Sequence, residues 1–527
     1  MRPFARAAFI AAGAALALAP RSAHATGFTD IGQDIVARDR VDVQVHGYMR
    51  VRAEALDNLD LDRGLTPSGQ PLYPVSLSDP NAQVLTYADM RLRTDFAIYA
   101  PGGGVAVKAR IDTFDDQPLG GSYVGAPATS TAQASLSNVF HVKRAYGEAL
   151  TPVGLLAAGR MGNAWGLGML ANGGDCADCD SGDSADRLAF LTPVLDHIVA
   201  LAYDFSATGP FVAGANGATF LNIAPSAAVH TVTFAVLHFR DELARKRRRL
   251  AGKTTFEYGA YVSHRWQGDD VPATYLPIAV PVALNASQVM MRGYTATAID
   301  GWARLTTPFA RVEAEFAMLL ANVDQPSLIP GVLYHTPVTS NQMGAALESA
   351  FGAPESRLGA GLDAGYASGD SAPGFNAFPK IAAPLAKPGD LNGGQANPPY
   401  DTHVDNFRFH PDYRIDRILF REIIGTVTNA IYVRPHAQWH IYQSAPGVLS
   451  AEVAGVASWA AIGSSTPGGK SPLGIEIDPT LAYASRDGFG IALEYGILFP
   501  LAGLDNPQSH LDAKLAQLAR VRLMYLF

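Results

Sequence analysis

Residues 41–55 read "VDVQVHGYMRVRAEA", and apolar and polar side chains alternate through most of this stretch. Successive residues of a β-strand point to opposite faces, so the alternation predicts a strand with one apolar and one charged face. The apolar face carries Val41, Val43, Val45, Met49, Val51, Ala53 and Ala55. The polar face carries Asp42, Gln44, His46, Tyr48, Arg50, Arg52 and Glu54.

The same alternation recurs along the chain. It is clear at 88–99, 105–114, 309–319, 473–483 and in "RVRLMYLF" at 520–527. The first two of these stretches flank "PGGG" at 101–104, which is typical of the tight turn of an antiparallel hairpin. We therefore expect an all-β fold.

Short turns alternate with long polar connections. The long ones lie near residues 57–85, 115–138, 166–186, 207–227, 268–292, 324–338, 368–424, 461–472 and 501–512. Nine such loops predict about 18 strands, with 16 as the alternative. A bilayer leaves no water for an open sheet edge, so the sheet must close. The pattern predicts a transmembrane antiparallel up-and-down β-barrel with short periplasmic turns and long extracellular loops.

The first 25 residues are typical of a secretory signal peptide. Arg2 and Arg6 precede a short apolar run, and Ala23 and Ala25 fit the small-residue rule for cleavage. We expect a short periplasmic segment at 26–40, too short for a plug domain, and a single barrel at 41–527.

Composition excludes several classes of protein. The formal net charge of −8 argues against nucleic acid as a partner. Two cysteines cannot provide a disulfide framework. The sequence carries no nucleophile elbow, zinc-protease helix or dinucleotide fingerprint, so we expect neither an enzyme nor a cofactor.

The run at 520–527 resembles the closing strand of bacterial outer-membrane proteins through Val521, Leu523, Tyr525 and Phe527. The resemblance implies the outer membrane of a Gram-negative bacterium, contact with its lipid, and Tyr525 and Phe527 as the signal read by the barrel-assembly machinery. Residues 147–168, 365–370 and 495–503 resemble porins of the alginate-export type. They also resemble a family of predicted outer-membrane proteins without an assigned function.

Charges of both signs occupy the face opposite the lipid. The residues predicted to line the lumen are Arg50, Arg52, Glu54, Arg91, Arg93, Asp95, Lys108, Arg110, Asp112, Arg160, Arg311, Glu313, Glu315, Glu476 and Asp478. Unpaired ions are costly in a dry core, so the lumen must be wet or densely paired. One interpretation is a pore whose basic strip faces acids and orients polar solutes. The other is a structural ladder of ion pairs inside a plugged barrel.

Two loops are candidates for a functional role. The longest, 368–424, is predicted either to fold inward through Arg408, Arg414, Arg417 and Arg421 or to form an extracellular cap. The acidic stretch 173–187 contains Cys176 and Cys179, for which we expect a short disulfide in a solvated loop. A Ca²⁺ site at Asp178, Asp180 and Asp183 is the alternative, whereas a zinc site would need more ligands.

The sequence thus favours passive diffusion of small hydrophilic solutes through the outer membrane. Anionic solutes, or export of an acidic polysaccharide, are the more specific candidates. A structural or adhesive barrel without an open pore is the first alternative, and a barrel enzyme with a loop-side site is the second. A homo-oligomer and a single barrel are both compatible with the chain.

Overall fold

A computed structural model describes residues 28, 31–32, 38–66, 71–76, 83–120, 139–271, 289–327, 332–334, 336–353, 355–370 and 401–527. Over these residues the chain forms an 18-stranded antiparallel sheet, and a separate two-stranded ribbon, β8–β9, lies outside it. Each barrel strand pairs with its neighbours in chain order, and β7 pairs with β10. The first strand also pairs with the last, so the sheet is a closed barrel, as predicted.

The strand bounds follow the predicted alternation. The N-terminal barrel strands are β1 Asp42–Asp57, β2 Val84–Tyr99, β3 Val105–Pro118, β4 Phe140–Thr151, β5 Gly154–Gly162, β6 Ser184–Val194 and β7 His197–Ala207. The middle strands are β10 Val229–His238, β11 Thr255–Gln267, β12 Tyr294–Thr306, β13 Ala310–Val323, β14 Val338–Phe351 and β15 Leu358–Ala367. The C-terminal strands are β16 Ala430–Gln443, β17 Gly447–Ala460, β18 Pro472–Ser485, β19 Phe489–Pro500 and β20 Ala516–Leu526.

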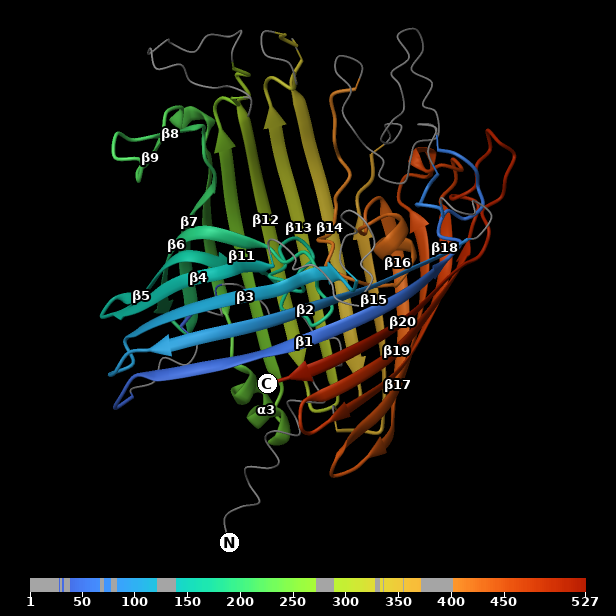
Figure 1. Cartoon of the computed structure of the whole chain (residues 1–527), viewed down its shortest axis with the longest axis horizontal. Coiled ribbons are helices and arrows are strands. Elements are labelled where there is room, and N and C mark those ends of the chain that lie inside the picture. The colour runs from blue at the N-terminus through green and yellow to red at the C-terminus, as the bar shows by residue number, and fades with distance from the viewer. Residues whose placement is uncertain are drawn as a thin grey trace, which may run out of the picture.

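The two ends of the barrel differ. The short turns, the C-terminus and helix α3 (Glu242–Leu250) lie at one end, drawn at the bottom of Figure 1. The long connections lie at the other end, where the ribbon of β8 (Phe211–Ala213) and β9 (Phe220–Asn222) projects. Within the described residues no helix is both apolar enough and long enough to cross a membrane.

The seam between β1 and β20 explains one glycine. The backbones of Gly47 and Phe527 exchange two hydrogen bonds, at 3.0 and 3.1 Å. A Cβ on Gly47 would lie 2.1 Å from the Arg93 carbonyl oxygen and 2.9 Å from the Phe527 ring. Any larger residue would therefore clash with β2 and with the Phe527 ring at the junction of β1 and β20.

The outer face carries an apolar band between two aromatic belts, well seen on β7, β10 and β11. In the belt near the long loops, the Tyr203 hydroxyl lies 2.7 Å from His230 Nδ1, and the His230 ring lies 5.6 Å from that of Trp266. In the belt near the short turns, His197 Nε2 lies 2.8 Å from the Tyr258 hydroxyl, and His238 stacks on the Tyr258 ring.

Exposed apolar side chains fill the space between the belts. Leu201, Phe234 and Val262 are cross-strand neighbours there, and each is about half exposed. The eight residue-to-residue steps from His230 to His238 rise about 26 Å along the strand, or roughly 20 Å once a barrel tilt is allowed for. This height suits the hydrocarbon layer of a membrane.

Candidate functional site in the barrel lumen

Charged side chains alternate with exposed apolar ones on β1, β2 and β3. Arg50 and Arg91 are fully buried, whereas Val43 and Val107 on the opposite face are more than half exposed. The buried face points to the inside of the barrel, because its side chains bind a loop that lies there. Among the predicted lining residues, the following lie on inner faces: Arg50, Arg52, Glu54, Arg91, Arg93, Asp95, Lys108, Arg110, Asp112, Arg311, Glu313, Glu315, Glu476 and Asp478.

Arg160 is the exception. It lies on the face of β5 that carries exposed Leu156, and it pairs with Asp186 at 2.7 Å, both side chains being about half exposed. The prediction that Arg160 lines the lumen is therefore wrong. Its strand register places it with the outward side chains, near the end where the long loops begin.

The loop 163–183, between β5 and β6, folds into the barrel. Arginines of the wall donate to its backbone: Arg50 to the Ala177 carbonyl at 3.1 Å, and Arg93 to the Gly174 carbonyl at 2.6 Å. The predicted disulfide between Cys176 and Cys179 is present at the tip. The expectation of a solvated acidic loop is thus wrong, because the barrel wall supplies the cations that its acids need.

Five guanidinium groups surround the carboxylate of Asp178. The contacts are with Arg52 at 3.2 Å, Arg414 at 3.2 Å, Arg421 at 2.6 Å, Arg520 at 3.4 Å and Arg522 at 3.5 Å. Burial alone would raise the pKa of the Asp178 carboxyl, but these cations outweigh it and hold the pKa well below its usual range. Asp178 is therefore an ionised hub that joins loop 163–183 to the barrel wall and to Arg414 and Arg421 of a second loop, described below.

The carboxylates predicted as alternative Ca²⁺ ligands form ion pairs or contacts with other side chains. Asp180 binds Arg50 at 3.0 Å and Arg52 at 3.1 Å, and guanidinium groups thus fill the positions that a metal would need. Asp183 lies beside His410, at 3.5 Å. No group of three or more His, Cys, Asp or Glu in the described part of the chain is arranged to hold a metal ion.

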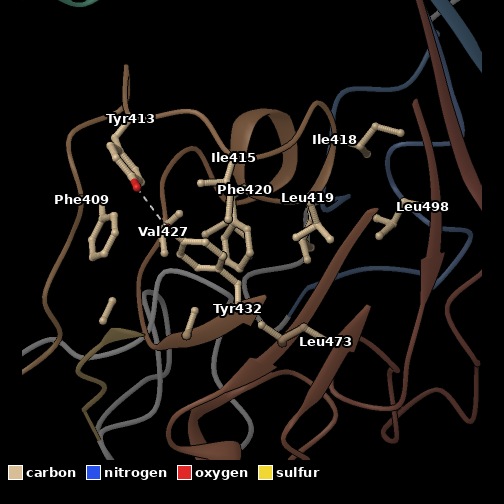
Figure 2. Packing of buried hydrophobic residues seen from close by; sticks show 14 of the residues in the cluster. Phe409, Tyr413, Ile415, Ile418, Leu419, Phe420, Val427, Tyr432, Leu473 and Leu498 are labelled. Carbon is tan, nitrogen blue, oxygen red and sulfur yellow. Dashed lines mark hydrogen bonds between the residues drawn. The ribbon is translucent and has the colours of Figure 1, made fainter. Parts of the chain in front are cut away.

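A second inward loop, 401–429, lies between β15 and β16. Residues 371–400 of the predicted long loop fall outside the described residues. The apolar side chains of 401–429 pack on β16, β18 and β19, as Figure 2 shows for Phe420, Leu419 and Leu473. The Tyr413 hydroxyl meets that of Tyr432 at 3.2 Å.

The two loops are joined to each other and to the wall. Asp412 accepts the backbone N–H groups of Asp180 and Ser181, both at 2.9 Å. Glu476 of β18 accepts the backbone N–H groups of Arg417 and Ile418, both at 2.8 Å. Of the arginines considered for constriction, Arg414, Arg417 and Arg421 lie inside and make ion pairs, whereas Arg408 is exposed. Of the two predicted arrangements of this loop, residues 401–429 therefore adopt the one that folds into the barrel, and not the extracellular cap.

Another part of the lumen wall is apolar. We call this the apolar sector: the inner faces of β5, β6, β7 and β10 together with three aromatic side chains. Its members are Leu155, Ala157, Met161, Ala189, Leu191, Ala200, Ala202, Ala235 and Leu237, with Trp165, Tyr261 and Trp302. Phe28 and Ile31 pack into the same cluster, so part of the predicted periplasmic segment lies inside the barrel. In the sequence, Phe28, Ile31 and Ile35 have the i, i+3, i+7 spacing of an apolar helix face, a signal that could have pointed to burial of this segment.

Several buried polar atoms in the lumen lack a protein partner. They include Nε of Arg50, Arg414 and Arg522 and Oε2 of Glu54. Buried polar atoms in folded proteins are hydrogen-bonded to protein or to water. We therefore expect ordered water molecules to be the partners of these atoms.

No protein-family model matches this sequence, and no curated protein matches it either. Several solved structures are similar. OpdK of Pseudomonas aeruginosa, crystallised with vanillate, is 11% identical with a TM-score of 0.45, covering 92% of this chain and 98% of its own. The outer membrane channel DcaP of Acinetobacter baumannii is 11% identical with a TM-score of 0.35, covering 93% and 99%. OmpT of Vibrio cholerae is 9% identical with a TM-score of 0.34, covering 94% and 100%. At this level of identity the likeness concerns the fold and says nothing of function.

Proposed function

We propose that this protein is an outer-membrane channel through which small hydrophilic solutes diffuse. The observation that carries the proposal is the contrast between the two faces of one closed barrel. The outer face is apolar between aromatic belts, and the inner face carries many charged side chains. Barrels of 16–18 strands are wide enough to hold an aqueous channel, which inward loops then narrow.

The charge balance of the lumen favours small solutes with weak charge selection. The arginines of β1 and β2 are paired with acids of the wall and of loop 163–183, as Arg52 is with Asp89 and Arg93 with Asp112. A strongly acidic polysaccharide would meet as many carboxylates as guanidinium groups. Such a lumen suits neutral or weakly anionic solutes better than an acidic polymer.

The test is conductance of the purified protein in a planar bilayer, with reversal potentials under a salt gradient. We expect channels of low conductance with a modest anion preference. This preference should weaken at high salt, because the electrostatic screening length becomes shorter. The double variant Arg91→Ala, Arg93→Ala should conduct more than the wild type, because both arginines hold the backbone of loop 163–183.

The matched control is Arg160→Ala, whose side chain lies on the outer face and should leave conductance unchanged. A silent bilayer with a correctly folded barrel would contradict the channel. A selectivity shift in the double variant without a change in conductance would contradict the anchoring role of the two arginines.

A closed structural barrel is the second candidate, and a specific observation favours it. Loops 163–183 and 401–429 and residues Phe28 and Ile31 all fill parts of the lumen. Solute-swelling assays with liposomes separate the two candidates, because a closed barrel admits no sugar of any size.

A further inference from the structure

The ring of Phe28 packs against the side chains of the apolar sector. It is 4% exposed although it belongs to no strand of the barrel. The Arg187 guanidinium lies 5.1 Å above the Phe28 ring, within the range of a cation–π contact. Arg187 is itself fixed by two hydrogen bonds to Asp204, at 2.6 and 2.8 Å. The ring therefore lies beneath an immobilised cation.

The wall of the apolar sector is built from small side chains that are cross-strand neighbours. Ala157 faces Ala189, and Ala189 faces Ala202. Ala200 likewise faces Ala235 on the next strand. Alanine side chains are small, and the larger Phe28, Trp165 and Trp302 pack in the same cluster. We call this alanine-lined part of the wall, with which Phe28 packs beneath the Arg187 guanidinium, the recess.

We propose that this recess binds the aromatic group of a solute, and that Phe28 fills it in the resting barrel. The proposal rests on the proposed channel, because such a solute reaches the recess through the lumen. Phe28 precedes β1 and takes no part in the ladder of strand hydrogen bonds. A free aromatic group can therefore replace its ring without breaking the barrel. The cation above the ring favours an aromatic group over a saturated one of equal size.

Fluorescence quenching tests the proposal on folded protein in detergent. The probe is 4-nitrobenzyl alcohol, a neutral aromatic quencher, and Trp165 and Trp302 report on the recess. In Phe28→Ala we expect the probe to bind at least about tenfold more tightly than to the wild type, because the competing ring is gone. Benzyl alcohol should displace the probe at lower concentration than cyclohexylmethanol does.

Two variants serve as controls. Val41→Ala removes an exposed apolar group just before β1 and should bind the probe like the wild type. Ala202→Phe fills the recess from the wall, so adding it to Phe28→Ala should abolish the tighter binding. Retention of native heat-modifiable migration in gels shows that each variant is folded.

Equal probe binding by the wild type and Phe28→Ala would overturn the proposal. Equal displacement by the aromatic and saturated alcohols would also overturn it. The measurement needs no ion flow, so a silent bilayer would refute the channel and leave this result standing on its own.

Discussion

The lumen of this barrel has two unlike sides. The ion-paired side combines β1–β3, β19 and β20 with loop 163–183, and its contacts join residues far apart in the chain, such as Arg52 and Asp178. The apolar sector on β5–β7 and β10 is formed by small side chains on neighbouring strands. Both sides arise from the same alternation. The difference teaches that buried charges require partners, which neighbouring strands supply in part and inward loops complete, whereas an apolar wall requires only side chains of fitting size.

The largest expected effect comes from breaking the seam, because neither side exists in an open sheet. Deleting Phe527 removes two backbone hydrogen bonds to Gly47 and the proposed assembly signal. We expect little folded barrel in the outer membrane, measured by heat-modifiable migration in gels. Normal levels of folded protein would contradict the role of Phe527.

Removing the hub of the ion-paired side should be the next largest effect. Asp178→Ala leaves five guanidinium groups without their shared carboxylate, and an uncompensated buried charge costs about 3–5 kcal/mol. Denaturant unfolding of the purified barrel measures the loss. The control is Asp186→Asn, which disrupts the exposed pair with Arg160 and should change stability by less than about 1 kcal/mol. Equal losses of unfolding free energy in the two variants would mean that the buried ion pairs of Asp178 contribute no more than the exposed pair of Asp186 and Arg160.

Changing both Cys176 and Cys179 to Ser should have a smaller effect. Their disulfide closes a very short ring, and the contribution from chain entropy is at most about 2 kcal/mol. The arginine contacts to neighbouring carbonyl groups remain, so we expect the barrel to keep its thermal midpoint within a few degrees. Current noise should increase as the tip of loop 163–183 loosens. Loss of the folded barrel would show that the disulfide comes before the ion pairs in assembly.

The smallest effect concerns pH. Burial opposes ionisation of Asp175, Asp178 and Asp180, but neighbouring arginines hold all three pKa values below the ordinary 3.8. A depressed pKa contributes stability that is present above 3.8 and is lost as the pH falls through the folded-state value. Trp165 fluorescence should therefore be unchanged between about pH 7 and pH 5 and should shift only below about pH 4. A transition between pH 7 and pH 5 would contradict the assignment to these three carboxyl groups.

The sequence was sufficient for the barrel but not for its contents. Alternation identifies strands and their two faces, so 18 strands and the inner charges followed from it. Alternation does not say what fills the inside. Asp178 looked like part of a solvated loop, because its partners lie 126 (Arg52) to 344 (Arg522) positions away in the chain.

Two other features escaped the pattern for different reasons. Arg160 was misplaced because its charge suggested the lumen, whereas the alternation of β5 places it outward with Leu156, and exposed Asp186 supplies its partner. Phe28 was overlooked because its spacing with Ile31 and Ile35 is helical, whereas the strands of the barrel are identified by a two-residue period. Arg520 and Arg522 alternate clearly on β20 and could have been included among the lining residues.

The seam also sets an order of events. Arg520 on β20 donates to Glu54 on β1 at 2.6 Å, and the two residues are 466 positions apart. Contacts of such separation form late, since the intervening chain must be positioned first. The hub around Asp178 draws on both strands, so its full set of cations assembles only after β20 has paired with β1. Until then, β1 carries arginines that will be buried in the finished barrel, and the backbone N–H and C=O groups along one of its edges have no strand partner. A nascent barrel is then most exposed to proteolysis at its N-terminal strands, although these are the first to be made.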